Sequence, residues 1–111
     1  LGESDIWKDD SKEPSNYMKN IARAAESLYK ILFRLYPKED LQKVFDEIFA
    51  MYNSSLVEHF SILRLSKIGK QRLYNDITFL IEHCSKFKDV EEQAESLDLL
   101  KKFYETQFGT I

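Results

Sequence analysis

The sequence predicts an all-α domain, an antiparallel four-helix bundle that forms part of a helical rod. Apolar residues recur every three or four positions over long stretches, which is the helical period. Only 3 glycines and 2 prolines occur among the 111 residues, too few for a chain of many tight turns. The length suits one compact domain. We expect a flexible acidic leader, residues 1–14, and a bundle, residues 15–111, cut from a longer protein.

The first helix is expected between Ser15 and Tyr36. Ser15 follows Pro14, and its side chain can cap the free N–H groups of the first turn. From Met18 onward the apolar residues are one or three positions apart and form one wide stripe. Pro37 ends the helix, because the residue before a proline is pushed out of the α region.

The second helix is expected to begin near Lys38, where Glu39 and Asp40 suit the positive end of the helix dipole. Its apolar stripe runs over residues 41–63. A weak spot lies at residues 53–55, but we expect the helix to continue, because Leu56 and Phe60 keep the phase of the stripe.

Two further helices follow Gly69, which marks the turn or the first helical residues. The third helix carries a seam of alternating four- and three-residue steps that ends at Phe87. The fourth is expected to start at Asp89, whose spacing from Glu92 resembles a capping box, and to end before a left-handed cap at Gly109. The side chains expected in the core are Leu28, Leu32, Phe45, Ile48, Leu73, Ile77, Leu80, Cys84, Leu97 and Leu100.

The net charge of −3 divides into segments of alternating sign. The leader carries −3, residues 15–36 carry +3, residues 37–63 carry −3, residues 64–87 carry +3 and residues 88–111 carry −3. Consecutive helices should therefore attract one another weakly. We expect the two basic helices to lie diagonally across the bundle without making one basic face. This pattern argues against binding to nucleic acid.

The sequence indicates no enzyme, cofactor or metal site. His59 and His83 each stand beside a glutamate, but adjacent helical residues point about 100° apart, so neither pair faces one site. Cys84 falls on the seam, where burial should raise the pKa of its thiol. A catalytic or metal-carrying bundle is the alternative, which metal analysis of the purified domain would test.

Two groups of residues are candidates for contact with a partner. Aromatic side chains beside the stripes could form a docking face, and a basic cluster around the second connection could meet an acidic partner segment or anionic lipid. The alternatives are packing within the bundle and a solvated loop rim. No apolar run approaches the ~18 residues of a membrane span. The candidates are Phe33, Phe49, Arg64, Lys67, Lys70, Arg72 and Tyr74.

The order of several motifs carries a resemblance to a known family. The motifs are Pro14-Ser15-x-x-Met18, Leu28-Tyr29-Lys30-Ile31-Leu32, Leu35-Tyr36-Pro37, Val44-Phe45-x-x-Ile48-Phe49-x-x-Tyr52 and Gly69-Lys70-x-Arg72-Leu73-x-x-Asp76-x-x-Phe79-Leu80. Residues 14–87 thus resemble the C-terminal helical domain of the Vps-fifty-four family, subunits of the Golgi-associated retrograde protein (GARP) complex. More broadly they resemble the helical-rod multisubunit tethers, which include the exocyst, the conserved oligomeric Golgi complex and the Dsl complex. The last motif is the most specific.

The resemblance implies a non-enzymatic domain of a tether that captures endosome-derived vesicles at the trans-Golgi network. It implies a cytoplasmic protein, peripheral on trans-Golgi and endosomal membranes, with Gly69, Lys70 and Arg72 in a binding role. The implied partners are other tether subunits, endosomal or vesicle membrane proteins, SNAREs or small GTPases, with direct lipid contact left open. The alternative is the equivalent domain of another tether, which binds a Rab, a SNARE or a sister subunit.

Overall fold

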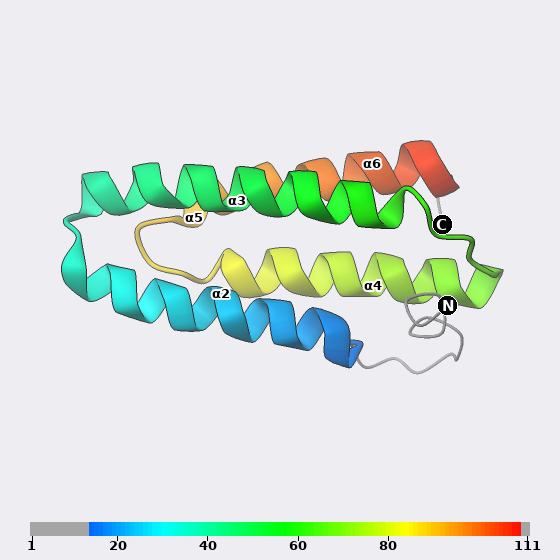
Figure 1. The fold of residues 1–111 in the computed structure, drawn as a ribbon, viewed down its shortest axis with the longest axis horizontal. Helices are drawn as coiled ribbons and strands as arrows, with labels where there is room; N and C mark the ends of the chain where they lie inside the picture. Colours follow the sequence, from blue (N-terminus) through cyan, green and yellow to red (C-terminus); the bar gives the residue numbers. More distant parts are fainter. Residues whose placement is uncertain (1–13, 110–111) are drawn as a thin grey trace.

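The computed structural model describes residues 14–109, which form a bundle of helices and contain no strand. The structure measures 44 × 24 × 21 Å, and its long axis follows the helices (Figure 1). The all-α bundle predicted from the sequence is confirmed. The leader expected before Ser15 lies almost wholly outside the described residues. The elements are α2 (Asn16–Leu35), α3 (Lys38–Phe60), α4 (Lys67–Cys84), α5 (Glu91–Ala94), the 3₁₀ helix η1 (Glu95–Leu97) and α6 (Asp98–Phe108).

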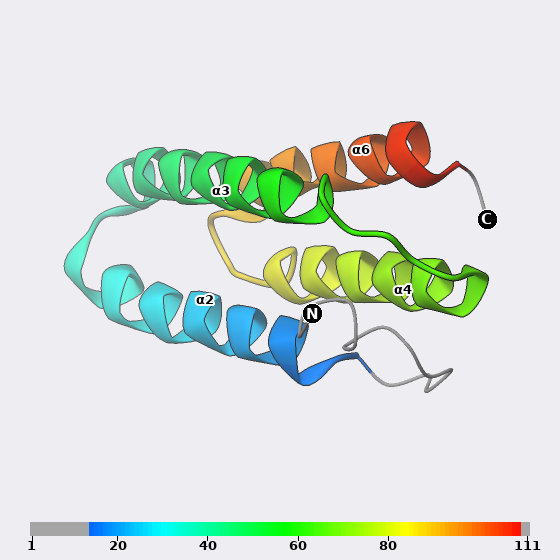
Figure 2. The same ribbon diagram turned by 45° about the vertical axis from the view of Figure 1, so that its right-hand side comes forward.

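Successive long helices run antiparallel, but the neighbours in space differ from those expected. Helix α2 packs most closely along α4, and both run in the same direction (Figure 1). Helix α3 packs along the α5–η1–α6 run, while α4 also contacts α6. Figure 2 shows α2 and α4 on one side of the bundle and α3 and α6 on the other. The expected diagonal placement of the two basic helices is therefore wrong, because α2 and α4 lie side by side.

Most of the expected helix boundaries are confirmed by the capping geometry. The Ser15 hydroxyl accepts a hydrogen bond from the Met18 N–H at 3.2 Å, and α2 ends just before Pro37. Helix α3 continues unbroken to Phe60. Gly69 lies in the first turn of α4, where its N–H donates to the Ser66 hydroxyl at 3.1 Å. A positive φ of 85° at Gly109 matches the expected glycine cap after α6.

The chain between α4 and α6 departs from the expectation of two long continuous helices. Helix α4 ends at Cys84, so Phe87 lies in the connection rather than on the helix, although its ring is buried. Asp89 has a positive φ of 71° and caps no helix, so the predicted capping box does not form. The expected fourth helix is divided into α5, η1 and α6. The side-chain amide of Asn53 on α3 donates to the Ser96 carbonyl at 2.9 Å. This hydrogen bond joins α3 to η1, where the expected fourth helix is divided.

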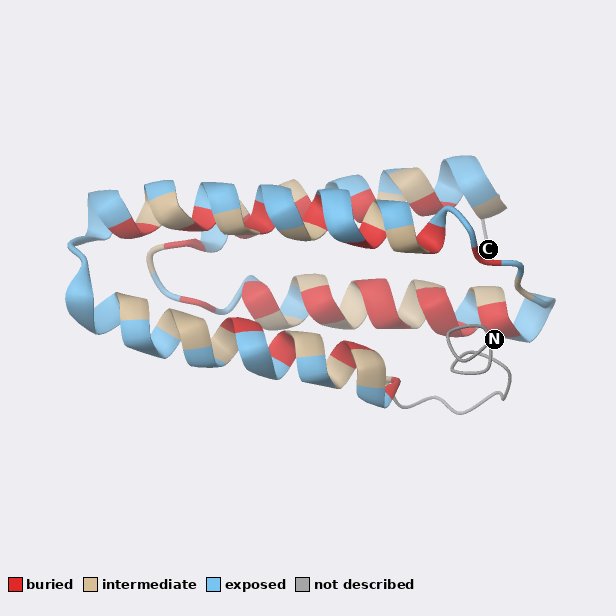
Figure 3. Cartoon of the chain, in the orientation of Figure 1, coloured by how far each residue is buried: buried red, intermediate tan, exposed pale blue. Residues whose placement is uncertain are grey.

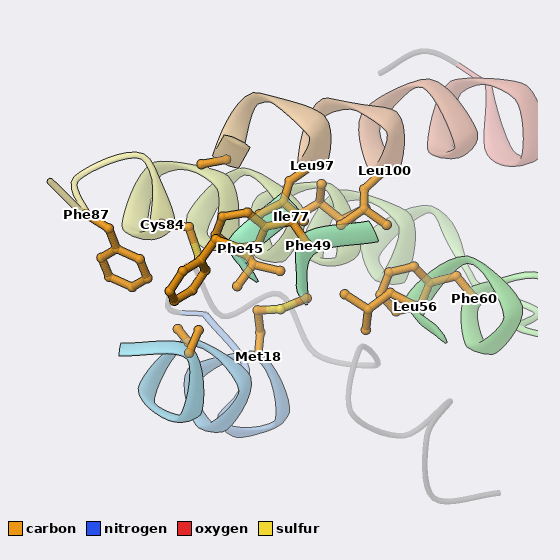
Figure 4. Close-up of a cluster of buried hydrophobic side chains, with 14 of the residues drawn as sticks. Met18, Phe45, Phe49, Leu56, Phe60, Ile77, Cys84, Phe87, Leu97 and Leu100 are labelled. Carbon is orange, nitrogen blue, oxygen red and sulfur yellow. The ribbon is translucent and has the colours of Figure 1, made fainter. Parts of the chain in front are cut away.

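The core fills the space between the four long elements and is lined by the predicted stripes. Buried residues recur along the inner side of each helix (Figure 3). The rings of Phe45 and Phe49 lie 5.3 Å apart, and Figure 4 shows them among side chains from every long element. Burial confirms the core prediction for Phe45, Leu73, Ile77, Leu80, Cys84, Leu97 and Leu100.

Three predicted core residues are less buried than expected. Leu32 and Ile48 are partly buried and pack against the core. Leu28 is half-buried and stands outside the core cluster, so its assignment to the core is wrong. The physical reason is rotation on α2: Leu28 lies three residues after Ala25, and the inward direction at that level is occupied by Ala25 and Tyr29.

Candidate binding surfaces

The connection between α3 and α4, residues 61–66, lies at one end of the rod (Figure 1). Basic and apolar residues follow one another there in the sequence. Ile62 is 77% exposed and Ile68 is 46% exposed. Arg64 and Lys67, two of the predicted candidates, are also exposed. We call these four residues the basic corner: Ile62, Arg64, Lys67 and Ile68.

The geometry of the basic corner follows from two serine caps. Ser61 caps the end of α3 and its hydroxyl donates to the Glu58 carbonyl at 2.8 Å. Ser66 caps the start of α4 through the Gly69 N–H. Both ends of the connection are thereby held, which reduces the backbone entropy that the connection loses on binding.

The remaining members of the predicted basic cluster, Arg72 and Lys70, are less exposed than Arg64 and Lys67. Arg72 is 7% exposed, so the expectation that it reaches a partner is wrong. Lys70 is half-buried, and its carbonyl accepts a hydrogen bond from the Tyr104 hydroxyl at 2.8 Å. Tyr74 packs 5.4 Å from the Tyr104 ring, with the Lys101 ammonium 6.0 Å from its own ring centroid. These contacts join α4 to α6.

The two phenylalanines predicted to contact a partner differ in exposure. Phe49 is fully buried, so its assignment to a docking face is wrong: its place on α3 points to the centre of the bundle. Phe33 is 40% exposed near the end of α2, and its ring lies 5.4 Å from that of Tyr29. The Tyr29 ring stacks in turn on Phe87 at 4.6 Å.

A larger exposed apolar surface lies on the outer side of α2 and α3 and was missed by sequence reasoning. Ile31 is 57% exposed, Leu35 is 70% exposed and Met51 is 59% exposed. The sequence already contained a second series of apolar residues on α2, spaced by four, three and four positions. We call this surface the α2–α3 face and define it as Ala24, Leu28, Ile31 and Leu35 of α2 with Val44, Ile48 and Met51 of α3.

The titratable groups considered for chemistry are held in structural contacts. The His83 Nε2 atom lies 2.9 Å from a carboxylate oxygen of Glu26, a contact that links α4 to α2. The Lys30 ammonium, 3.1 Å away, lowers the pKa of Glu26 below its ordinary value, and His83 adds to the effect. Burial raises the pKa of the Cys84 thiol to about 12. No group of three His, Cys, Asp or Glu side chains in residues 14–109 could hold a metal ion.

The described part of the surface includes two open depressions. One is lined by Ser55, Glu58, His59 and Ile62 on α3, where the His59 ring stacks on Tyr17 of α2 at 5.4 Å. The other lies near the start of α3 and mixes both signs of charge, with Lys38, Gln42, Asp89, Glu91 and Glu92 around it. Neither brings together a nucleophile, a base and an oxyanion donor.

Comparison with known proteins gives no relative. The chain matches no family model, no curated protein and no solved structure. No described helix combines the length and the apolar character that crossing a bilayer requires.

Proposed function

We propose that this chain is a docking domain of a helical-rod vesicle tether, which binds an acidic segment of a partner protein through the basic corner. The observation that best supports this proposal is the position of the basic corner. It presents two cations and two exposed isoleucines at the end of a 44 Å rod. A tether needs a spacer with binding contacts at its ends. The motif resemblance of residues 14–87 to the GARP subunit family supports the same proposal.

The chemistry of the corner fits a partner segment of mixed acidic and apolar character. Arg64 and Lys67 are exposed and can pair with carboxylates of an approaching partner. This attraction steers association and makes binding sensitive to salt. Ile62 and Ile68 offer apolar area that a purely electrostatic contact would leave in water. The proposed partner classes are sister subunits of the tether and proteins of endosome-derived vesicles, and the proposed location of the parent protein is at trans-Golgi and endosomal membranes.

A binding experiment with charge reversal tests this function. The domain is immobilised and exposed separately to purified subunits of the GARP complex and to endosome-derived vesicles. The double variant Arg64→Glu/Lys67→Glu should lose about ten-fold or more in binding, since each close charge pair contributes about 1 kcal/mol and reversal adds repulsion. The control Lys43→Glu/Lys86→Glu changes two exposed lysines at the other end of the rod and should bind normally.

The outcomes separate the alternatives. Retention of neither subunits nor vesicles by the unmodified domain would contradict the tether function. Binding to protein-free vesicles of anionic lipid, and not to protein partners, would replace the acidic segment with a membrane as the ligand. Equal loss in the control pair would assign the effect to total charge and not to the corner.

A further inference from the structure

Helix α2 carries two apolar seams, and the bundle uses only one of them. The core seam is Met18, Ala22, Ala25, Tyr29 and Leu32. The second seam runs along the α2–α3 face and lies about 100° further round the helix, since successive residues rotate by that angle. Its residues Ile31 and Leu35 are more than half exposed. An amphipathic helix ordinarily presents polar residues on its outer side, whereas this apolar seam is covered by no element of residues 14–109.

The second seam faces the side on which α3 lies. Tyr17, eleven residues before Leu28, occupies the same side of α2, because eleven residues complete about three turns. Its ring stacks on His59 of α3, and Ile48 lies eleven residues before His59. Leu28 and Ile48 therefore stand at the same level on facing sides of the two helices. The apolar surface is thus continuous across α2 and α3.

Two rows of charge border this surface. Arg23, Lys30 and Arg34 follow the outer edge of α2 at steps of seven and four. All three are exposed. The outer edge of α3 carries the opposite sign. Its exposed acidic residues are Asp40, Glu47 and Glu58, and the exposed Lys43 stands between the first two, so the row has a net charge of −2.

The two charged rows are largely unused within the described part of the chain. Lys30 pairs with Glu26 at 3.1 Å, and Arg23 donates to the side-chain oxygen of Asn20. Among the described residues, Arg34, Asp40 and Glu47 make no ion pair. An apolar strip with one basic and one acidic border is complementary to itself when it is turned by 180°.

We propose that the α2–α3 face binds a second copy of this chain, related by a two-fold axis parallel to the helices. That operation sets α2 of one copy on α3 of the other, so each basic row meets an acidic row. The Tyr17–His59 contact puts Lys30 level with Asp46, next to Glu47. Arg34 is level with Gln42, between Asp40 and Lys43. One register therefore brings the apolar strips together and sets Lys30 beside acidic residues of the other copy.

The alternative geometries are less favourable on physical grounds. A two-fold axis across the helices sets α2 on α2, so that like charges meet. A membrane of anionic lipid would attract the α2 edge but repel Asp40 and Glu47 on the α3 edge of the same face. The face covers about 600 Å², from a helix length of ~30 Å and two helix diameters of ~10 Å. That is below the ~800 Å² per partner of a standard interface, so a weak dimer is expected.

Sedimentation equilibrium of the 111-residue chain over the micromolar range tests the dimer. The unmodified chain should show a monomer–dimer equilibrium. Ile31→Asp/Leu35→Asp should shift it to monomer by at least ten-fold in dissociation constant. Leu99→Asp changes a comparably exposed residue outside both the face and the basic corner and should leave it unchanged. Circular dichroism confirms that each variant is folded.

Charge exchange tests the geometry. Lys30→Glu/Arg34→Glu makes both borders acidic, and Asp40→Lys/Glu47→Lys makes both basic. Each variant should be monomeric by itself, and an equimolar mixture should form heterodimers, since every border again meets its opposite. A monomeric unmodified chain overturns the proposal, as does a dimer that persists in Ile31→Asp/Leu35→Asp. A mixture that stays monomeric, or binding to anionic vesicles in place of the dimer, also overturns it.

Discussion

Asp76 of α4 accepts two hydrogen bonds from Ser15 at the start of α2. The Ser15 N–H donates to one carboxylate oxygen at 2.9 Å and its hydroxyl donates to the other at 2.6 Å. The same hydroxyl accepts from the Met18 N–H, so one serine both caps α2 and joins it to α4. Both residues are buried, 61 positions apart in the chain. The contact fixes which helix lies beside α2.

Replacement of Asp76 by asparagine should lower the free energy of unfolding by about 1.5–3 kcal/mol. The asparagine NH2 group cannot accept a hydrogen bond, so one of the two Ser15 donors loses its acceptor and the other loses a charged one. Urea unfolding followed by circular dichroism measures the change. Asp46→Asn removes the same charge at an exposed site on α3 and should cost little. An unchanged midpoint for Asp76→Asn would contradict the role given to the Ser15 contact.

Leu100→Ala should destabilise the domain by about 2–5 kcal/mol, because a fully buried side chain leaves a cavity. Leu99→Ala makes the same chemical change one residue earlier, where the side chain is 52% exposed, and should cost less than about 1 kcal/mol. Thermal unfolding compares the two variants. Equal midpoints would mean that the rotational phase of α6 is wrong.

Asn53→Ala should cost about 1–2 kcal/mol, since the Ser96 carbonyl loses its side-chain donor at the break between α5 and α6. Hydrogen exchange should quicken in residues 91–97 before it quickens in α2. The neighbouring change Ser54→Ala removes an exposed side chain from α3 and serves as the control. Uniform acceleration along the chain would show that Asn53 supports the whole bundle and not the break.

The Cys84 thiol should resist alkylation at pH 8 in the folded domain and react after unfolding in urea. Burial raises its pKa from 9.0 to about 12, so the reactive thiolate is scarce in the native state. The resulting stabilisation is complete below pH 9 and is lost as the pH rises through 12, because the unfolded state ionises first.

The comparison of unmodified chain and Cys84→Ala isolates this pH dependence. Stability of the unmodified chain should fall more steeply with pH above 9 than stability of the variant. Tyr104, whose pKa burial also raises to about 12, contributes equally to both proteins. Fast alkylation of the folded chain at pH 8 would contradict the burial of the thiol.

The candidate site was partly predictable from the sequence. Arg64 and Lys67 follow from charge next to a connection, and such residues are exposed in most folds. Arg72 and Phe49 were misassigned, because a charge or a ring beside a stripe is exposed or buried according to which neighbours surround the helix. Ile31 was overlooked because a single apolar stripe was enough to predict α2 as an amphipathic helix.

The sequence by itself determined most helix boundaries, though not the division of the expected fourth helix: the seams, the serine caps, the stop at Pro37 and the glycine cap at residue 109 are local properties of a few turns of chain. The tertiary structure decided the helix neighbours. Alternating charge suggested that acidic and basic helices would adjoin, but exposed pairs contribute only about 0.2–1 kcal/mol each. Ala22 and Ala25 are buried on the core side of α2, which packs most closely along α4, and the buried Ser15–Asp76 contact fixes that pairing. Packing and buried hydrogen bonds outweigh surface charge, so the two basic helices lie together.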